Sequence, residues 1–336
     1  MDDLDKRILT AIQSDLPVTE RPFDAVAARL DVGADEVLDR VRRLLADGAI
    51  RRLGPVFDSR SLGYVSTLVA AKVPPGRLDE VADAVNRLPG VTHNYERRGA
   101  YNLWFTLTEP SQDALDGRLA RLRAQTGIAD IHSLPALTVY KIRVHFDLTD
   151  DEPERGERGG CGGRPRSRSR GPAQPPPLTD EQKEFVRLIQ DGLPPEHEPF
   201  TEMAERLGWP VKRVVEQVCE WLDGGVIRRF GAVVEHRGLG YRAGGMAVFR
   251  AGPKEVDAAG ASLAEHPEVS HCYRRPPLPD FPYTLFAMTH GRSEGEVRRT
   301  VAHMAADAGL GDYDVLFSVR EFKKASMRYF MEDGAR

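Results

Sequence analysis

The sequence is poor in cysteine and has no long apolar run. Its three cysteines, Cys161, Cys219 and Cys272, form no CxxC pair, which predicts neither a disulfide framework nor a zinc site. No stretch approaches the roughly 18 apolar residues that cross a bilayer, and the acidic start MDDLDK is the reverse of a basic secretory signal. These absences predict a cytoplasmic protein without membrane association or a protein-only metal site.

An excess of positive charge is also lacking. The formal net charge is −4, and residues 1–60 hold twelve Asp and Glu against ten Lys and Arg. Residues 178–237 hold twelve against eight. A domain that binds phosphates normally concentrates positive charge on one face, so this balance argues against DNA as a partner.

A long internal repeat is present instead. GAIRRLGPVFDSRSLGY, from Gly48 to Tyr64, pairs with GVIRRFGAVVEHRGLGY, from Gly225 to Tyr241. About thirty residues later come VTHNYERRGAYNLWF in the first case and VSHCYRRPPLPDFPYTLFAMTH in the second. The period is too long for a solenoid repeat, so the sequence predicts a tandem duplication of a two-domain protein.

Each copy changes from a helical to a strand pattern. LDKRILTAIQ, PFDAVAARL and GADEVLDRVRRLLADG have helical periodicity, and AIRRLGPVFD alternates like a short wing. The segments that follow, from YVSTLVAAKV to DIHSLPALTVYKIRVHF, have the order βαββαβ. Each copy is therefore predicted to be a winged helix-turn-helix followed by a ferredoxin-like domain.

The predicted fold is α+β, with the two copies packed as an internal pseudo-dimer. We expect winged helix-turn-helix domains at 1–60 and 179–238, ferredoxin-like domains at 61–148 and 239–333, and a flexible linker at 149–178. The linker is rich in Gly, Pro, Arg and Ser and cannot bury enough apolar surface to order itself. Its length permits pairing within one chain, while pairing across chains in a homo-oligomer stays open.

The joined domains resemble the Lrp/AsnC transcription regulators through GAIRR…LGY. IRRLGPVFDSRSLGY, THNYERRGAYNLWFTL and SHCYRR…FPYTLFAMTHGR resemble more closely the two subunits of the sirohaem decarboxylases, here in one chain. The resemblance implies a carboxy-lyase that removes carbon dioxide from two acetate side chains of sirohaem and gives didecarboxysirohaem. It implies a role in haem d1 or alternative haem biosynthesis, with the active site in the ferredoxin-like part.

The repeated stretch supplies groups that suit such a substrate. Alternate residues of a strand share a face, so His93, Tyr95 and Arg97 lie together, as do His271, Tyr273 and Arg275. The arginine fork binds carboxylates, and sirohaem is a polycarboxylate. The candidate substrate-binding residues are Arg97, Arg98, Arg274, Arg275, Tyr95, Tyr273, Tyr101, Trp104 and Tyr283. For the aromatic residues at 101, 104 and 283, and for Phe286, core packing is the alternative.

Three histidines are the candidate catalytic residues. Decarboxylation needs an acid to protonate the new carbon, and an imidazole with a pKa near 6.5 suits this task. We therefore expect His271, His290 and His93 to be catalytic, with His271 or His290 alternatively an axial ligand of the sirohaem iron. The first copy has Thr108 where the second has His290, which predicts one principal site centred on the second copy.

No cofactor beyond the iron of the substrate is expected. The conjugated macrocycle can accept the electrons left by carbon dioxide, and no GxGxxG fingerprint opens a βαβ unit. Two rival functions stay open: an Lrp/AsnC-type DNA-binding regulator and a non-catalytic tetrapyrrole carrier or sensor. Six other histidines are expected to be surface or structural residues: His132, His145, His197, His236, His266 and His303.

Overall fold

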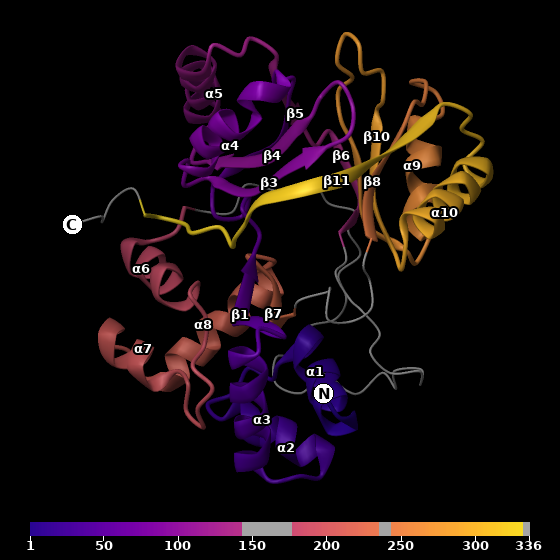
Figure 1. Ribbon diagram of the computed structural model, residues 1–336. Coiled ribbons are helices and arrows are strands. Elements are labelled where there is room, and N and C mark those ends of the chain that lie inside the picture. The colour runs from indigo at the N-terminus through magenta and orange to yellow at the C-terminus, as the bar shows by residue number, and fades with distance from the viewer. Residues whose placement is uncertain (143–176, 235–242, 332–336) are drawn as a thin grey trace. The chain divides into compact units, whose positions relative to one another are not determined.

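The computed structural model describes residues 1–142, 177–234 and 243–331. The chain divides into two compact units, each built from both copies. Unit 1 contains Met1–Gly63, His145–Leu239 and Arg328–Arg336, and unit 2 contains Tyr64–Val144 and Gly240–Met327 (Figure 1). The predicted linker, except its last two residues, lies outside the described ranges, as do Cys161, His145 and His236. The predicted domain limits stay predictions.

Unit 1 holds the two helix-turn-helix domains. The first copy contributes α1 (Asp3–Asp15), α2 (Pro22–Leu30), α3 (Ala34–Ala46) and β1 (Ile50–Phe57). The second contributes α6 (Asp180–Ile189), α7 (Thr201–Leu207), α8 (Val211–Gly224) and β7 (Ile227–Val234). Helix α1 begins with a capping box of Asp2 and Asp5, and α6 with one of Thr179 and Gln182. Such boxes satisfy backbone N–H groups that have no partner inside the helix.

The predicted wings are not separate hairpins. Strand β1 pairs antiparallel with β7, and Gly54 lies opposite Gly231 in a two-stranded ribbon. A single strand leaves its backbone donors and acceptors unpaired. Pairing with the duplicate strand satisfies these groups and joins the copies within unit 1.

Unit 2 confirms the predicted βαββαβ order in both copies. The first copy consists of β2 (Val65–Ala71), a 3-10 turn (Pro75–Arg77), α4 (Leu78–Asn86), β3 (Val91–Arg97), β4 (Leu103–Glu109), α5 (Gln112–Thr126), β5 (Ile131–Pro135) and β6 (Thr138–Ile142). The second consists of β8 (Ala243–Phe249), α9 (Val256–Glu265), β9 (Val269–Arg274), β10 (Leu285–Gly291), α10 (Glu294–Asp307) and β11 (Tyr313–Lys324).

The two copies exchange their last strands. The nine strands have the order β5-β2-β4-β3-β11-β8-β10-β9-β6. Strand β11 pairs with β8 over Tyr313–Phe317 and then with β3 of the other copy over Ser318–Lys324. In the same way β5 pairs with β2, while β6 pairs with β9 of the other copy. Each copy therefore completes the sheet of the other.

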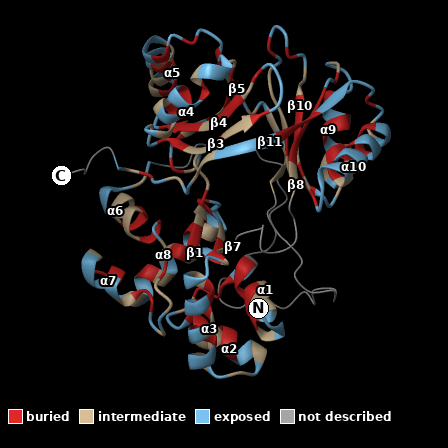
Figure 2. Ribbon diagram, viewed as in Figure 1, coloured by how far each residue is buried: buried red, intermediate tan, exposed pale blue. Residues whose placement is uncertain are grey.

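Three hydrophobic clusters of described residues stabilise unit 2. One lies between α4, α5 and the strands of the first copy, and a second between α9, α10 and the strands of the second. The third takes side chains from both copies: Ala70, Tyr101, Trp104, Leu134, Met246, Val248, Leu278, Phe281, Phe286 and Leu316. The inner faces of the two half-sheets thus pack against each other, and Figure 2 shows the buried residues along these strands. We call this third cluster the shared core.

Three further features of the described residues are the state of the free cysteine, the apolar length of the helices and the grouping of possible metal ligands. Cys272 is a buried free thiol, and burial raises its pKa to about 12. Among the helices of the described ranges, none is both long and apolar enough to span a membrane. The described His, Cys, Asp and Glu side chains form no group of three or more suited to a metal ion.

Candidate active site

In the first copy, strand β3 carries a row of three neighbouring side chains. The ring centroids of His93 and Tyr95 are 6.2 Å apart, with 30° between the ring planes. The guanidinium carbon of Arg97 lies 5.4 Å from the centroid of the Tyr95 ring. The sequence predicts that residues spaced by two lie on one face of the strand. In the structure these three side chains are neighbours on β3.

The second copy repeats this row on strand β9. His271 and Tyr273 have ring centroids 6.2 Å apart and planes 24° apart. The guanidinium carbon of Arg275, directly after β9, lies 4.7 Å from the Tyr273 centroid. We call the two sets the His-Tyr-Arg rows.

The arginine of each row is engaged with the backbone of the other copy. Arg97 Nη1 donates to the carbonyl of Leu316 at 2.7 Å, and Arg275 Nη1 donates to the carbonyl of Leu134. Arg97 is only 6% exposed, and burial lowers its pKa to about 10. These contacts give both side chains a structural role. Their predicted role as carboxylate anchors stays a prediction.

The neighbouring arginines are more accessible. Arg98 is exposed, and its Nη1 lies 3.3 Å from Glu294 Oε2. Arg274 is half-buried, and its Nη1 lies 3.5 Å from Asp257 Oδ1. Exposed ion pairs of this kind contribute little stability. The role of both arginines in substrate binding stays a prediction.

The candidate aromatic residues belong mostly to the shared core. Trp104 is 1% exposed, and its Nε1 donates to the Tyr101 carbonyl at 2.7 Å. The Tyr101 hydroxyl donates to Asp280 Oδ1 at 3.1 Å, and burial together with this carboxylate raises its pKa to about 12. The half-buried Tyr283 packs edge-on against Phe281 with centroids 4.8 Å apart. These contacts match the core-packing alternative, including that for Phe286, which is 2% exposed.

His271 and His290 are joined through one hydroxyl group. Ser270 Oγ lies 2.9 Å from His271 Nδ1 and 2.8 Å from His290 Nε2. Burial lowers the pKa of His290. Sequence reasoning missed Ser270, although a hydroxyl residue directly precedes the row histidine in both copies, as Thr92 and Ser270.

The corresponding region of the first copy is built differently. Thr92 Oγ1 lies 2.9 Å from His93 Nδ1 and 2.8 Å from Thr106 Oγ1. Thr108, at the place of His290, instead donates to Ser66 Oγ at 2.9 Å. The strand registers pair Thr108 with Ser66 and His290 with Gly244. A hydroxyl pair in copy one thus corresponds to a glycine and an imidazole in copy two.

The remaining described histidines lie beside carboxylates. His132 contacts Asp130 and His197 contacts Asp24 and Asp35, whereas His266 and His303 both contact Asp307. These contacts fit the surface or structural roles expected from the sequence.

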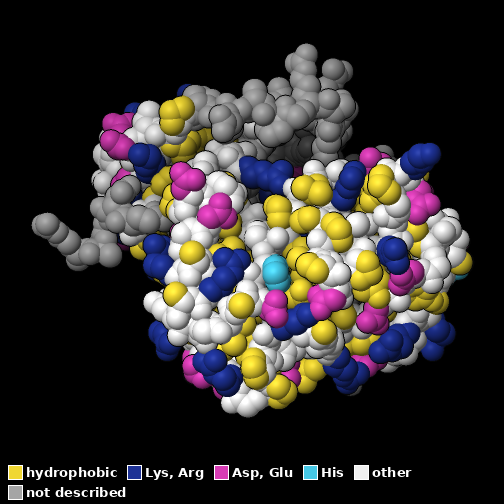
Figure 3. Space-filling model, turned by 90° about the horizontal axis from the view of Figure 1, so that it is seen from above, with side chains coloured by type: hydrophobic (Ala, Val, Ile, Leu, Met, Phe, Trp, Pro, Cys, Tyr) yellow, Lys and Arg dark blue, Asp and Glu magenta, His cyan; other side chains and the backbone are white. Residues whose placement is uncertain are grey.

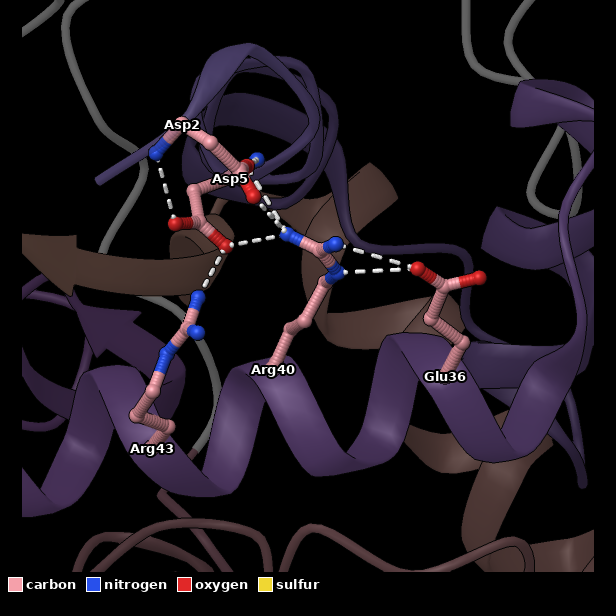
Figure 4. Close-up of polar contacts among 5 residues, drawn as sticks. All are labelled: Asp2, Asp5, Glu36, Arg40 and Arg43. Carbon is pink, nitrogen blue, oxygen red and sulfur yellow. Dashed lines mark hydrogen bonds and ion pairs between the residues drawn. The ribbon is translucent and has the colours of Figure 1, made fainter.

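The basic side chains of α3 are held by acids of the same domain. Arg40 Nη1 lies 2.7 Å from Asp2 Oδ2 and 2.9 Å from Asp5 Oδ1, and Arg43 Nη2 lies 2.5 Å from the same Asp5 oxygen (Figure 4). The hydrogen bond from Arg40 lowers the pKa of Asp2 to about 2. Glu36 binds Arg40 from the other side at 3.1 Å. In a helix-turn-helix that binds DNA, such groups would contact phosphates or bases.

On the face drawn in Figure 3, Lys and Arg side chains are interspersed with Asp, Glu and hydrophobic residues, and this face gathers no single sign of charge.

Two family models match the chain. An AsnC-like ligand binding domain matches residues 61–141 and 238–323. A siroheme decarboxylase NirDL-like HTH domain matches residues 5–51 and 182–228. Each model matches twice, as the duplication requires.

Individual relatives extend over nearly the whole chain. A siroheme decarboxylase of Hydrogenobacter thermophilus is 36% identical over 331 residues, which cover 98% of this chain and 96% of that protein. A siroheme decarboxylase alpha subunit of Desulfovibrio desulfuricans is 46% identical over 151 residues, 45% of this chain and 87% of that subunit. The crystal structure of the siroheme decarboxylase NirDL with an iron-uroporphyrin III analogue has a TM-score of 0.73 at 33% identity, covering 98% of this chain and 95% of that one. On this full-length similarity, the chain belongs to the sirohaem decarboxylase family in its fused NirDL form.

Proposed function

We propose that this protein is a sirohaem decarboxylase, a carboxy-lyase that removes carbon dioxide from two acetate side chains of sirohaem to give didecarboxysirohaem. The observation that carries the proposal is similarity over nearly the full chain to NirDL-type decarboxylases. The two His-Tyr-Arg rows support it, because they supply imidazoles beside aromatic rings in both copies. The relative solved with an iron-uroporphyrin III analogue points to the same ligand class.

Substrate binding would use the accessible arginines. Arg98 and Arg274 are the candidate anchors for peripheral carboxylates, since their present ion pairs are at least partly exposed to solvent. Tyr95 and Tyr273 would contact the macrocycle, each held by the arginine of its own row. In this scheme Arg97 and Arg275 position the tyrosines.

The chemistry requires one proton for each carbon dioxide released. The bond between the side-chain carbon and its carboxylate breaks, and the electron pair stays on that carbon, delocalised into the conjugated macrocycle. A proton then forms the new C–H bond. We assign its delivery to His271 with His290, and His93 of the other copy completes the site. A neutral imidazole of His271 or His290 is also a candidate axial ligand of the substrate's iron.

The helix-turn-helix domains would serve packing rather than DNA recognition. The acids that bind Arg40 and Arg43 support this view, as does the joint ribbon of β1 and β7. The proposed partners are therefore sirohaem and, within the chain, the second copy, in a cytoplasmic enzyme without a cofactor beyond the iron of its substrate.

The test is anaerobic incubation of the purified protein with sirohaem, followed by extraction and mass determination of the tetrapyrrole. Loss of two carbon dioxide units is expected. Recovery of intact sirohaem after a clear absorption shift would instead identify a carrier or sensor. A parallel titration with duplex DNA should show no binding that weakens with salt, and such binding without any sirohaem binding would overturn the proposal.

A further inference from the structure

One hydroxyl group in the second copy has two imidazole partners. Ser270 Oγ lies within hydrogen-bond distance of His271 Nδ1 and His290 Nε2, and its third contact is the Met288 carbonyl at 3.3 Å. A serine hydroxyl carries a single hydrogen and can donate to one partner at a time. At least one of the two ring nitrogens must therefore carry a hydrogen and donate it to Ser270. The protonation of one imidazole is thus linked to that of the other.

The first copy lacks this link at the equivalent position. Thr92 also contacts the row histidine, but its second side-chain contact is the hydroxyl of Thr106. A threonine hydroxyl does not take up a proton near neutral pH, whereas an imidazole does. Copy two therefore holds two linked proton carriers where copy one holds an imidazole and two hydroxyls.

A glycine faces the second imidazole. Gly244 lies opposite His290 in the β8–β10 pairing, and a Cβ atom added there would lie 3.8 Å from His290 Nδ1 and 3.5 Å from the Met288 methyl group. The equivalent residue of the first copy, Ser66, has a side chain that binds Thr108. The two copies thus differ at both positions of this pair, with serine and threonine in copy one and glycine and histidine in copy two.

We propose that Ser270 is a positioning residue that links His290 and His271 in one proton relay. The second copy then supplies the acid that protonates the substrate carbon. The inference rests on the proposed decarboxylation. His271 gives its proton to the side-chain carbon, Ser270 passes its own proton to His271, and His290 returns one to Ser270. His290 then takes a proton from solvent, so that each release of carbon dioxide consumes one proton overall.

Several other ionisable groups lie next to the relay. Tyr273 follows two residues along β9, and Lys141 of β6 lies opposite Cys272, with its Nζ bound to the His266 carbonyl. Beyond β10, the Glu296 carboxylate accepts from the Arg292 backbone. The variants that test the relay must therefore leave all of these groups unchanged.

The decisive variant is Ser270→Ala, assayed for sirohaem decarboxylation against wild-type protein. Without the hydrogen bonds of Ser270, His271 still delivers a first proton, but its imidazole is reprotonated slowly. We expect kcat to fall roughly tenfold to a hundredfold, somewhat below the effect of a complete general acid, while KM stays within about twofold. Singly decarboxylated product should accumulate. Ser270→Thr should restore most of kcat, because copy one accommodates threonine at this position.

Two further variants test whether the loss of kcat is specific to the contacts of Ser270. Thr108→Ala removes a buried hydroxyl from copy one, outside the site, and should retain wild-type kcat. His290→Gln keeps a polar group beside Ser270 but cannot carry the proton, so it should lower kcat and leave the iron absorption band of bound sirohaem unchanged.

An unchanged kcat in Ser270→Ala would overturn the relay, as would an equal loss of kcat in Thr108→Ala. A shifted iron absorption band in His290→Gln would also overturn it, because His290 would then be a ligand of the substrate's iron. If the wild-type protein itself releases no carbon dioxide, the proposed function fails instead, and the two failures are therefore distinguishable.

Discussion

His197 shows how a single side chain can link the two copies in unit 1. It lies between α6 and α7 of the second copy, whereas its partners Asp24 and Asp35 belong to α2 and α3 of the first. Its Nδ1 is 2.8 Å from Asp24 Oδ1, and its Nε2 is 3.0 Å from Asp35 Oδ1. The hydrogen bond to Asp24 and, to a smaller extent, the hydrogen bond to Asp35 raise the pKa of this histidine. Protonated, the imidazole can donate to both carboxylates at once.

Stability of unit 1 should therefore depend on pH through His197. The folded-state pKa lies above the ordinary value of 6.5, so the stabilisation is complete below that value and is lost as pH rises through the raised pKa. Because His197 is about one third exposed, solvent screening keeps the effect modest. His197→Ala should lower the urea midpoint at about pH 6 but much less at about pH 9. The same difference at both pH values would exclude this linkage.

Part of the arrangement of the site residues could be predicted from the sequence. The period of two along a strand correctly places His93 beside Tyr95 and His271 beside Tyr273. It could not show that Arg97 turns to a carbonyl, since the acceptor, Leu316, belongs to the other copy. Ser270 was missed for a related reason, because its second partner comes from a neighbouring strand about twenty residues away.

Among the elements, the exchanged strand β6 makes the most specific contact. Tyr140 on β6 lies against α9 of the other copy, and its hydroxyl donates to Asp257 Oδ1 at 2.6 Å. Its ring fills the space above Gly260, where an added Cβ atom would lie 2.3 Å from ring carbon Cε2. Glycine at this position is therefore a packing requirement of the exchange.

Gly260→Ala should destabilise the protein, because the added methyl group forces the Tyr140 ring and β6 away from α9. Overpacking of this kind costs about 1 to 3 kcal/mol, which denaturant unfolding can measure. Gly224→Ala is the matched control: it also adds a methyl group to a helical glycine, but no heavy atom lies within 4 Å of the new Cβ. Equal stability of the two variants would contradict the packing argument.

Element types could be predicted better than element partners. The alternation in AIRRLGPVFD correctly indicates a strand, but a wing was expected within each copy. The structure pairs β1 with β7 instead. Periodicity reports which face of a strand is buried, and it contains no information on which of two nearly identical copies supplies the neighbouring strand.

At the scale of the whole molecule, neither unit belongs to one copy. Unit 1 is joined by the β1–β7 ribbon, and unit 2 by the β3–β11 and β6–β9 pairings and the shared core. The duplication and the internal pseudo-dimer followed from the repeat in the sequence. The exchange of strands did not, since it depends on hydrogen bonding between segments that are far apart in the chain.

An interrupted chain tests this organisation. Residues 1–148 and 179–336, produced together as separate polypeptides, should purify as a one-to-one complex that retains sirohaem turnover. Each half produced alone should aggregate or unfold, because its exchange partners are missing. Light scattering and circular dichroism would measure both outcomes. Two stably folded, monomeric halves would show that the exchange is dispensable.

The strand exchange also has a consequence for synthesis on the ribosome. Copy one is translated first, so β1, β3 and β6 are complete before β7, β9 and β11 exist. Unpaired strand edges are sites of aggregation. Leu137, just before β6, and Val139, within it, are exposed apolar residues even in the folded protein. The edges of the first half therefore stay unpaired during synthesis, and β3 gains its partner only when Ser318–Lys324 of β11, the last strand in chain order, has been translated.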